Sequence, residues 1–133
     1  MTTRQQFCEP LQDHVRSTVD AVATGVLDGR PVAVSSGQDR RVRVWDLTSG
    51  EPVGEPLTGH TDGVYGVATG VVEGRPVAVT GSGDGTVRVW DLATGRPSGP
   101  ELAFPAEVFA VAFASDGRLV VGFGHEVAVL ARR

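Results

Sequence analysis

Short apolar runs rich in valine and alanine recur along the chain, and glycine, proline or acidic residues bound each of them. The clearest runs are 64–69, 76–82 and 86–91, separated by turn residues at 73–75 and 83–85. Runs of this length between turn signals are typical of β-strands. Since no stretch shows the 3.6-residue period of an amphipathic helix, the pattern predicts an all-β protein with essentially no helix.

The runs differ in polarity, and this difference predicts which strands are buried and which lie at the edge of the sheet. The run at 64–69 is small and apolar, the run at 76–82 is apolar on both sides, and the run at 86–91 mixes valine with arginine. A fourth run, 97–102, is rich in proline, which cannot donate to a strand ladder and belongs on an edge. We therefore expect a four-stranded meander whose burial decreases from the first strand to the fourth.

The same unit is present more than once. Residues 19–50 and 64–95 are identical at 20 of 32 positions when laid over each other without a gap. A third, divergent copy follows, with VFAVA at 108–112 and VAVL at 127–130. Repetition at a nearly fixed spacing predicts one structural unit built about three times.

In three details the unit resembles the WD40 repeat family. Trp45-Asp46 and Trp90-Asp91 are WD pairs, Gly59-His60 is a GH pair, and Asp84 stands six residues before Trp90. The resemblance covers about residues 7–130 and implies a β-propeller with four-stranded blades. The Pro/Gly-rich joins at 49–60 and 94–102 resemble those of long bacterial WD40 arrays, which are often attached to kinase, protease-like or NTPase modules.

The resemblance implies one repeat domain, 1–133, with about three blades. Because propellers usually have four to eight blades, we expect self-association or completion by further blades. Two copies would give six blades, with the first strand of each copy completing the third blade of the other. The expected parts are 7–11 as an orphan outer strand, 12–57 as blade 1, 58–102 as blade 2, and 103–133 as an incomplete blade 3 that lacks its own outer strand.

Four residues of the unit match the structural tetrad of the family. A buried indole N–H must find an acceptor, a hydroxyl can take that bond and pass one to an imidazole, and a carboxylate then fixes the imidazole. The second unit supplies His60, Thr80, Asp84 and Trp90; the first supplies His14, Ser35, Asp39 and Trp45; in the third, Phe104, Val120, Gly124 and Leu130 replace the set.

Hydroxyl, imidazole and carboxylate groups are also the parts of a hydrolase, but here they recur at structural spacings without a nucleophile elbow. The segment GSGDGT lacks the lysine of a phosphate-binding loop. Three scattered histidines and one cysteine give no zinc spacing. We expect no enzymatic activity, catalytic residue, metal or cofactor, and keep a small-ligand-binding or cryptic enzymatic propeller as an alternative.

Charge and composition limit the classes of partner that the protein can bind. The net charge is −4 without a dense basic run, which argues against nucleic acid. No apolar stretch has the length of a signal peptide or a membrane span. Cys8 is the single cysteine, so no disulfide can form within the chain. We expect a cytoplasmic protein that binds neither nucleic acid nor membranes.

The family resemblance implies a rigid platform for proteins or peptides. In the family, contacts concentrate on the face where the first strand of each blade begins. Tyr65 is the best single anchor, because aromatic residues with a polar tip are common in interface hot spots; alternatively, Tyr65 and Phe109 only line the central funnel. A second function class is a sensor or regulatory fragment of a larger signalling enzyme. The candidate contact residues are Asp20, Gln38, Tyr65, Phe109 and Phe123.

Overall fold

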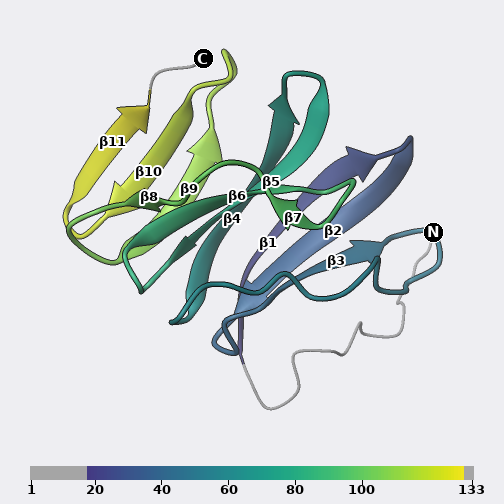
Figure 1. Ribbon diagram of the computed structural model, residues 1–133, viewed down its shortest axis with the longest axis horizontal. Coiled ribbons are helices and arrows are strands. Elements are labelled where there is room, and N and C mark those ends of the chain that lie inside the picture. The colour runs from purple at the N-terminus through teal and green to yellow at the C-terminus, as the bar shows by residue number, and fades with distance from the viewer. Residues whose placement is uncertain (1–17, 131–133) are drawn as a thin grey trace, which may run out of the picture.

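Three antiparallel sheets stand side by side like a partly opened fan (Figure 1). The structure is a computed structural model and describes residues 18–130. Within this range every regular element is a strand. The expectation of an all-β partial propeller without helix is therefore confirmed.

Each sheet is one blade of the fan, and the strands follow chain order from the inside to the outside. Consecutive strands are antiparallel and joined by short turns, as in a meander. Blade 1 contains β1 (Val19–Leu27), β2 (Arg30–Gly37) and β3 (Val42–Asp46); blade 2 contains β4 (Val64–Val72), β5 (Arg75–Ser82), β6 (Thr86–Asp91), β7 (Arg96–Pro97) and β8 (Leu102–Ala103); blade 3 contains β9 (Val108–Phe113), β10 (Leu119–Phe123) and β11 (Glu126–Leu130).

The first hairpin of blades 1 and 2 closes with a two-residue turn. Asp28 and Gly29 have φ of 52° and 78°, and Glu73 and Gly74 repeat these values. Positive φ at both central residues gives the primed turn whose twist matches the flanking strands. The turn expected at 73–75 is thus present, and it fixes which residues of the hairpin face the same side.

The outer strand expected at 97–102 is not continuous, which corrects that expectation. In blade 2, β7 pairs with the end of β6 and β8 with its beginning, and residues 98–101 between them belong to no strand, although the Ser98 N–H donates to the Val89 carbonyl at 2.7 Å. In blade 1 the outer edge consists of two single bridges, Val42 with Leu57 and Trp45 with Pro52. Prolines cannot donate to the ladder. The glycines at 54 and 99 have φ of 71° and 86°, which turns the chain away from the strand direction.

Burial is greatest in the second and third strands of blade 1 and in the second strand of blade 2, so the expected decrease from the first strand outward is wrong. β2 and β5 each contain six consecutive buried residues, whereas β1 is mostly exposed or half-buried. A middle strand is paired along both edges. Among residues 18–130, β1 has a partner strand along only one edge, and no blade lies against one of its faces.

The apolar core lies between the blades, in two clusters. One cluster joins Val42 and Val44 of blade 1 to Val64 and Trp90 of blade 2. The other joins Val79 and Val87 of blade 2 to the inner residues of blade 3, Val108, Val111 and Val121. Burying a valine side chain contributes about 1.5–3 kcal/mol, so each blade is stabilised mainly by the face of the next.

The inner strands of blades 2 and 3 approach each other closely at a glycine. A Cβ at Gly66 would lie 3.0 Å from the backbone of Ala110 and Val111 in the neighbouring blade. At Gly122, in blade 3, a Cβ would meet nothing closer than 3.7 Å. The spacing between blades 2 and 3 therefore depends on the missing side chain at Gly66.

These two glycines give a matched test of the fold. Gly66→Ala should lower the free energy of unfolding by about 1–3 kcal/mol, because the methyl group meets backbone that cannot move aside. Gly122→Ala should leave it unchanged or raise it by up to about 1 kcal/mol, because alanine loses less entropy than glycine on folding. Urea denaturation of both variants measures the difference, and equal stability of the two would contradict the packing described.

Candidate functional site

A β-bulge opens each blade at the edge where its first strand begins. The pairing register shifts between Val64 and Gly66 in β4, so Tyr65 is the extra residue. The same shift makes Asp20 the extra residue of β1 and Phe109 that of β9. Bulges re-aim side chains away from the regular pleat, and here they present one residue per blade at the same edge of the fan.

Two of these residues stack on each other across neighbouring blades. The rings of Tyr65 and Phe109 lie with centroids 5.7 Å apart and an interplanar angle of 18°. Phe109 is 48% exposed and Tyr65 is half-buried. The bulges thus create an exposed aromatic stack.

A polar pair continues this surface onto blade 1. The Gln38 side-chain amide donates to Asp20 Oδ2 at 2.8 Å. A Cβ at Gly63 would lie 3.1 Å from Gln38 Oε1 and 3.2 Å from the ring of Tyr65, so the pair and the ring both lie close to that glycine. We call Asp20, Gln38, Tyr65 and Phe109 the aromatic edge.

Phe123 does not occupy the position that the sequence suggests. The backbone N–H of Gly124, not that of Phe123, makes the bond to blade 3's entering loop that Gly83 makes in blade 2. The turn after β10 is one residue shorter than the turn after β5, which shifts the correspondence by one. The Phe123 ring instead packs against Phe104, with centroids 5.0 Å apart. Phe123 is therefore a half-buried packing residue of blade 3.

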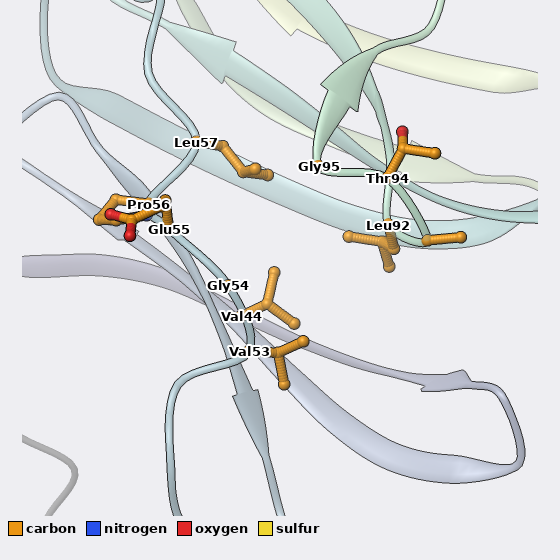
Figure 2. Close-up of a pocket in the computed structure, with 10 residues that line it drawn as sticks. Val44, Val53, Gly54, Glu55, Pro56, Leu57, Leu92, Thr94 and Gly95 are labelled. Atoms are coloured by element: carbon orange, nitrogen blue, oxygen red, sulfur yellow. The ribbon is translucent and has the colours of Figure 1, made fainter.

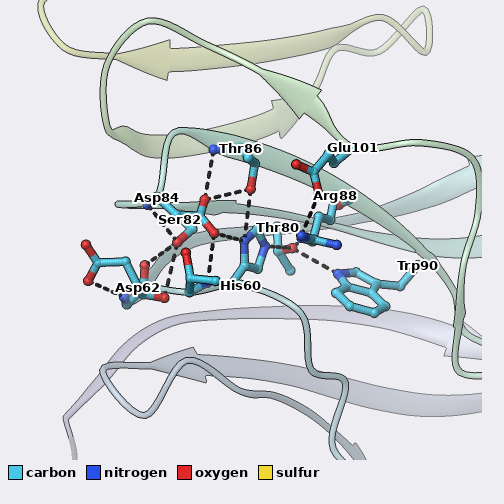
Figure 3. Close-up of polar contacts among 11 residues, drawn as sticks. His60, Asp62, Thr80, Ser82, Asp84, Thr86, Arg88, Trp90 and Glu101 are labelled. Carbon is cyan, nitrogen blue, oxygen red and sulfur yellow. Dashed lines mark hydrogen bonds and ion pairs between the residues drawn. The ribbon is translucent and has the colours of Figure 1, made fainter.

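A hydrogen-bonded chain crosses blade 2 (Figure 3). The Trp90 indole donates to Thr80 Oγ1 at 2.9 Å, and the same oxygen lies 2.7 Å from His60 Nε2. His60 Nδ1 lies 3.1 Å from Asp84 Oδ2. The structure thus brings together all four residues proposed for the second unit, from β5, β6, the turn between them and the loop that enters β4.

The direction of the protons follows from the two ends of the chain. An indole can only donate and a carboxylate can only accept. The Thr80 hydroxyl therefore donates to Nε2 of His60, and Nδ1 of His60 carries the proton that faces Asp84. A neutral imidazole satisfies both requirements at once.

Asp84 is held by more donors than the sequence suggests. Its two oxygens accept the backbone N–H groups of Thr61 and Thr86 at 2.9 Å each, and the Thr86 hydroxyl at 2.6 Å. Thr86 has no counterpart hydroxyl at Arg41 in blade 1, so the repeat alone does not reveal it.

These contacts shift both ionisable groups. Burial lowers the pKa of His60 below its usual 6.5, and the hydrogen bond and charge of Asp84 offset only part of this effect. Burial acts to raise the pKa of Asp84, but the hydrogen bonds from Thr86 and Thr61 outweigh it and lower that pKa to about 2. The pair is therefore a neutral histidine beside an ionised aspartate at neutral pH.

Hydroxyl, imidazole and carboxylate stand in the order of a hydrolytic triad, but the hydroxyl is not accessible. Thr80 is 0% exposed and its oxygen already accepts the Trp90 N–H. A nucleophile must reach the carbon that it attacks. In this arrangement the set holds β5, β6 and the entering loop together instead.

Blade 1 keeps part of the set. The Trp45 indole donates to Ser35 Oγ at 2.9 Å. Asp39 accepts the backbone N–H of Arg41 at 3.2 Å and pairs with the Arg43 guanidinium at 3.4 Å. His14, like the orphan strand expected at 7–11, lies outside the described residues.

In blade 3 the hydroxyl position belongs to a different residue than expected. Thr80 pairs with Arg88, and the residue that pairs at the same place in blade 3 is Val121, facing Ala128. Val121 is fully buried, whereas Val120 points to the opposite face. The replacement expected at Val120 is therefore wrong by one residue, because of the shorter turn.

The Asp of each WD pair is part of a second repeated arrangement that the sequence analysis missed. Arg30 Nη1 donates to Asp46 Oδ2 at 2.7 Å, and Arg75 pairs with Asp91 in the same way. The other oxygen of each aspartate accepts backbone N–H groups of the following turn. The repeated GRP and WD segments, 16 residues apart, are the signal that could have shown it.

Two hollows lie between blades, and both are mainly apolar. A cleft of about 250 Å³ between blades 1 and 2 is bordered by Val44, Val53, Leu57 and Leu92 (Figure 2). A groove of about 590 Å³ between blades 2 and 3 is bordered by residues such as Val89, Phe113 and Leu130, where Leu130 stands in place of a tryptophan. Neither brings several polar side chains together.

Residues 18–130 contain no group of three or more His, Cys, Asp or Glu side chains placed to hold a metal ion. The same part of the chain has no helix long and apolar enough to cross a membrane.

Removing the central hydroxyl tests the network. Thr80→Val keeps the shape of the side chain but leaves the Trp90 N–H and His60 Nε2 buried without partners, which should cost about 2–4 kcal/mol of unfolding free energy. Thr61→Val, at an exposed threonine of the same loop whose backbone N–H is kept, should change it by less than about 0.5 kcal/mol. Chemical denaturation gives both values; a Thr80→Val variant as stable as the control would exclude a stabilising role.

The shifted groups make stability depend on pH. Folded His60 binds protons less readily than the unfolded chain, so stability should fall as the pH drops below about 6.5. Asp84 adds stability that is complete above its unfolded value of 3.8 and is lost as the pH falls toward about 2.

Thermal melts between about pH 7 and 5 isolate the His60 contribution. His60→Asn should flatten the decline in melting temperature over this range, and His125→Asn, at an exposed histidine, should keep it. An unchanged decline in the His60 variant would show that another group controls it.

Comparison with known proteins agrees with this architecture. A family model described as WD domain, G-beta repeat, matches residues 5–46 and 50–91. A search of the curated proteins gave no match. A solved structure described as the WD40 beta propeller domain of Doa1 superposes with a TM-score of 0.70 at 21% identity, and the match covers 86% of this chain and 37% of that one.

At this level of identity the likeness to Doa1 shows the fold alone, and the chain spans little more than a third of that propeller. The segments matched by the family model make up 84 of the 133 residues. With more than half of its length matched, and with sheets arranged as propeller blades, the chain belongs to the WD40 repeat family.

Proposed function

We propose that the protein is a non-catalytic interaction scaffold that binds a protein or peptide at the aromatic edge. The exposed stack of Tyr65 and Phe109 carries this proposal. WD40 propellers are in general protein-interaction platforms, and aromatic residues are enriched where binding energy concentrates. No substrate can reach the buried Thr80 hydroxyl in this conformation, which favours a scaffold over a hydrolase.

Rigid support favours this edge as a binding site. The Tyr65 ring lies close to Gly63 and Gly83, and a Cβ at Gly83 would be 3.0 Å from the ring. The Ser82 hydroxyl donates to the Gly63 carbonyl at 2.9 Å, which fixes the loop beside the ring. A preorganised surface loses less conformational entropy when it binds.

The charge around the stack favours a basic partner. Asp20, Asp62 and Glu107 are exposed, and each lies at or next to the entry of a blade's first strand. Aromatic faces attract cations, and carboxylates pair with them. A peptide with lysine or arginine side chains therefore fits this edge best. The same acidic rim disfavours nucleic acid.

The proposal also covers how the ring is completed and where in the cell the protein acts. The ring is completed by further blades, which come from another copy or from a longer propeller. The single cysteine and the net charge of −4 are in keeping with a cytoplasmic protein that does not act at membranes. The second function class is the sensor part of a larger bacterial signalling enzyme, because the Pro/Gly-rich joins resemble those of such arrays.

Binding at the aromatic edge can be tested by selecting peptides from a random displayed library on the immobilised chain. Tyr65→Ala and Phe109→Ala should each weaken the selected peptides about 10- to 100-fold, as for an interface hot spot. The matched control is Val71→Ala, at a 70% exposed residue far along β4 from the bulge.

Melting temperatures are measured for the same variants. Loss of stability without loss of binding would mean that the aromatic pair only lines the funnel. Selected peptides should be rich in basic residues, and a set without them would contradict the role given to the acidic rim.

A further inference from the structure

The outward face of blade 3 repeats a face that is buried in the other two blades. Strand register places Val127 at the position of Val42 and Val87, and Val129 at that of Val44 and Val89. Val42 and Val87 are both 0% exposed, whereas Val127 is 71% exposed. Val44 is 7% exposed and Val129 is 54% exposed. We call Val127 and Val129 the tail face.

The outward face of blade 1, at the other end of the fan, also exposes valines whose counterparts in the other two blades are buried. Val19 occupies the position of Val64 and Val108, and is 51% exposed where they are 0% exposed. Val22 occupies the position of Val67 and Val111, and is 61% exposed where Val111 is 8% exposed and Val67 is packed against the core. We call Val19 and Val22 the head face.

Within the chain, faces of these two kinds pack on each other twice. Val42 and Val44 of blade 1 join the cluster that contains Val64 and Val67 of blade 2. Val87 and Val89 of blade 2 join the cluster that contains Val108 and Val111 of blade 3. The tail face and the head face would form a third pair of this kind. They cannot meet within one chain, because blades 1 and 3 lie at opposite ends of the fan (Figure 1).

We propose that the tail face of one copy of this chain docks on the head face of a second copy, head to tail. This inference rests on the proposed function, in which further blades complete the ring, and it names their source. A second copy carries the counterpart face in the register that already packs twice within the chain. Scattered exposed valines need no explanation, but patches that repeat a buried interface do.

The three blades that residues 18–130 form indicate how many copies the proposed ring would contain. Propellers have about four to eight blades, and six is the only multiple of three in that range. Two copies with two identical head-to-tail interfaces therefore close one ring. Such a ring has two-fold symmetry: the head face of each copy meets the tail face of the other, so the two contacts are equivalent and the dimer contact as a whole is isologous.

Sedimentation velocity of the full chain tests this arrangement from micromolar to millimolar concentration. The wild type should sediment as a species of twice 13.9 kDa. Val22→Asp and Val129→Asp should each weaken the dimer at least about 100-fold, since each buries a charge in both interfaces. Val71→Asp, at an equally exposed valine of blade 2, should leave the dimer intact.

The outcomes separate the possible arrangements. A dimer that survives Val22→Asp is built tail to tail, and one that survives Val129→Asp is built head to head; either result overturns the proposal. A wild type that stays monomeric overturns it as well, and points to blades from a longer propeller. All three variants change exposed residues, and circular dichroism with thermal melting checks that each is folded.

The peptide experiment remains independent of this one. A monomer that still binds selected peptides through Tyr65 would overturn only the docking of copies. A dimer that is insensitive to Tyr65→Ala in peptide binding would overturn only the use of the aromatic edge.

Discussion

Packing of one blade on the next is the interaction on which the rest of the structure depends. A single meander hides its backbone hydrogen bonds but leaves two apolar faces, and only another blade can cover them. The valines of β3 and β6 do this with the inner strands of the following blade. Hydrophobic burial is non-directional, so the register of the pairing and the missing side chain at Gly66 decide how the faces meet.

The buried polar network consists of hydrogen bonds, which are directional, whereas apolar packing is not. Trp90, Thr80, His60 and Asp84 connect two strands, a turn and a loop through bonds that each have one donor and one acceptor. A buried network with every member satisfied specifies one arrangement. It fixes the loop that leads into β4, and hence the bulge that carries Tyr65. Blade 3 replaces the network with apolar packing around Phe104 and Val121 and still forms its sheet.

Much of the fold can be predicted from the sequence because the repeat shows each pattern twice. The strand at 86–91 and the turn at 73–75 are found where the valine pattern and the turn residues put them. The broken outer strands are not predictable from composition. A proline-rich segment has the same sequence pattern whether it pairs with its neighbour only at its ends or along its whole length. Burial cannot be read from one strand either, since the exposure of β1 depends on a neighbour that the strand does not encode.

The candidate site also has parts that can be predicted from the sequence and parts that cannot. The resemblance to the WD40 family identifies His60, Thr80, Asp84 and Trp90 correctly, because Thr80, Asp84 and Trp90 lie on one regular hairpin and His60 lies in the loop that enters β4. Spacing fails in blade 3, where a turn one residue shorter moves the correspondence from Val120 to Val121 and displaces Phe123. The bulges are also invisible in the sequence, since an extra residue in a strand does not interrupt the alternation enough to be recognised. Tyr65, Phe109 and Asp20 share one place in the repeat, and the bulge explains why their side chains leave the regular pleat there.

Within the first strand, 19–26 and 64–71, six of eight positions are identical, and the bulge position is one of the two that differ. Asp20 and Tyr65 are unlike within a segment that is largely identical, while the valines and the WD pair are copied unchanged. The bulge turns this side chain out of the regular pleat, so strand pairing does not depend on which residue occupies the position. Duplication of such a unit would therefore transmit the architecture intact and leave one residue per blade to diversify, which lets new recognition evolve without a penalty in stability.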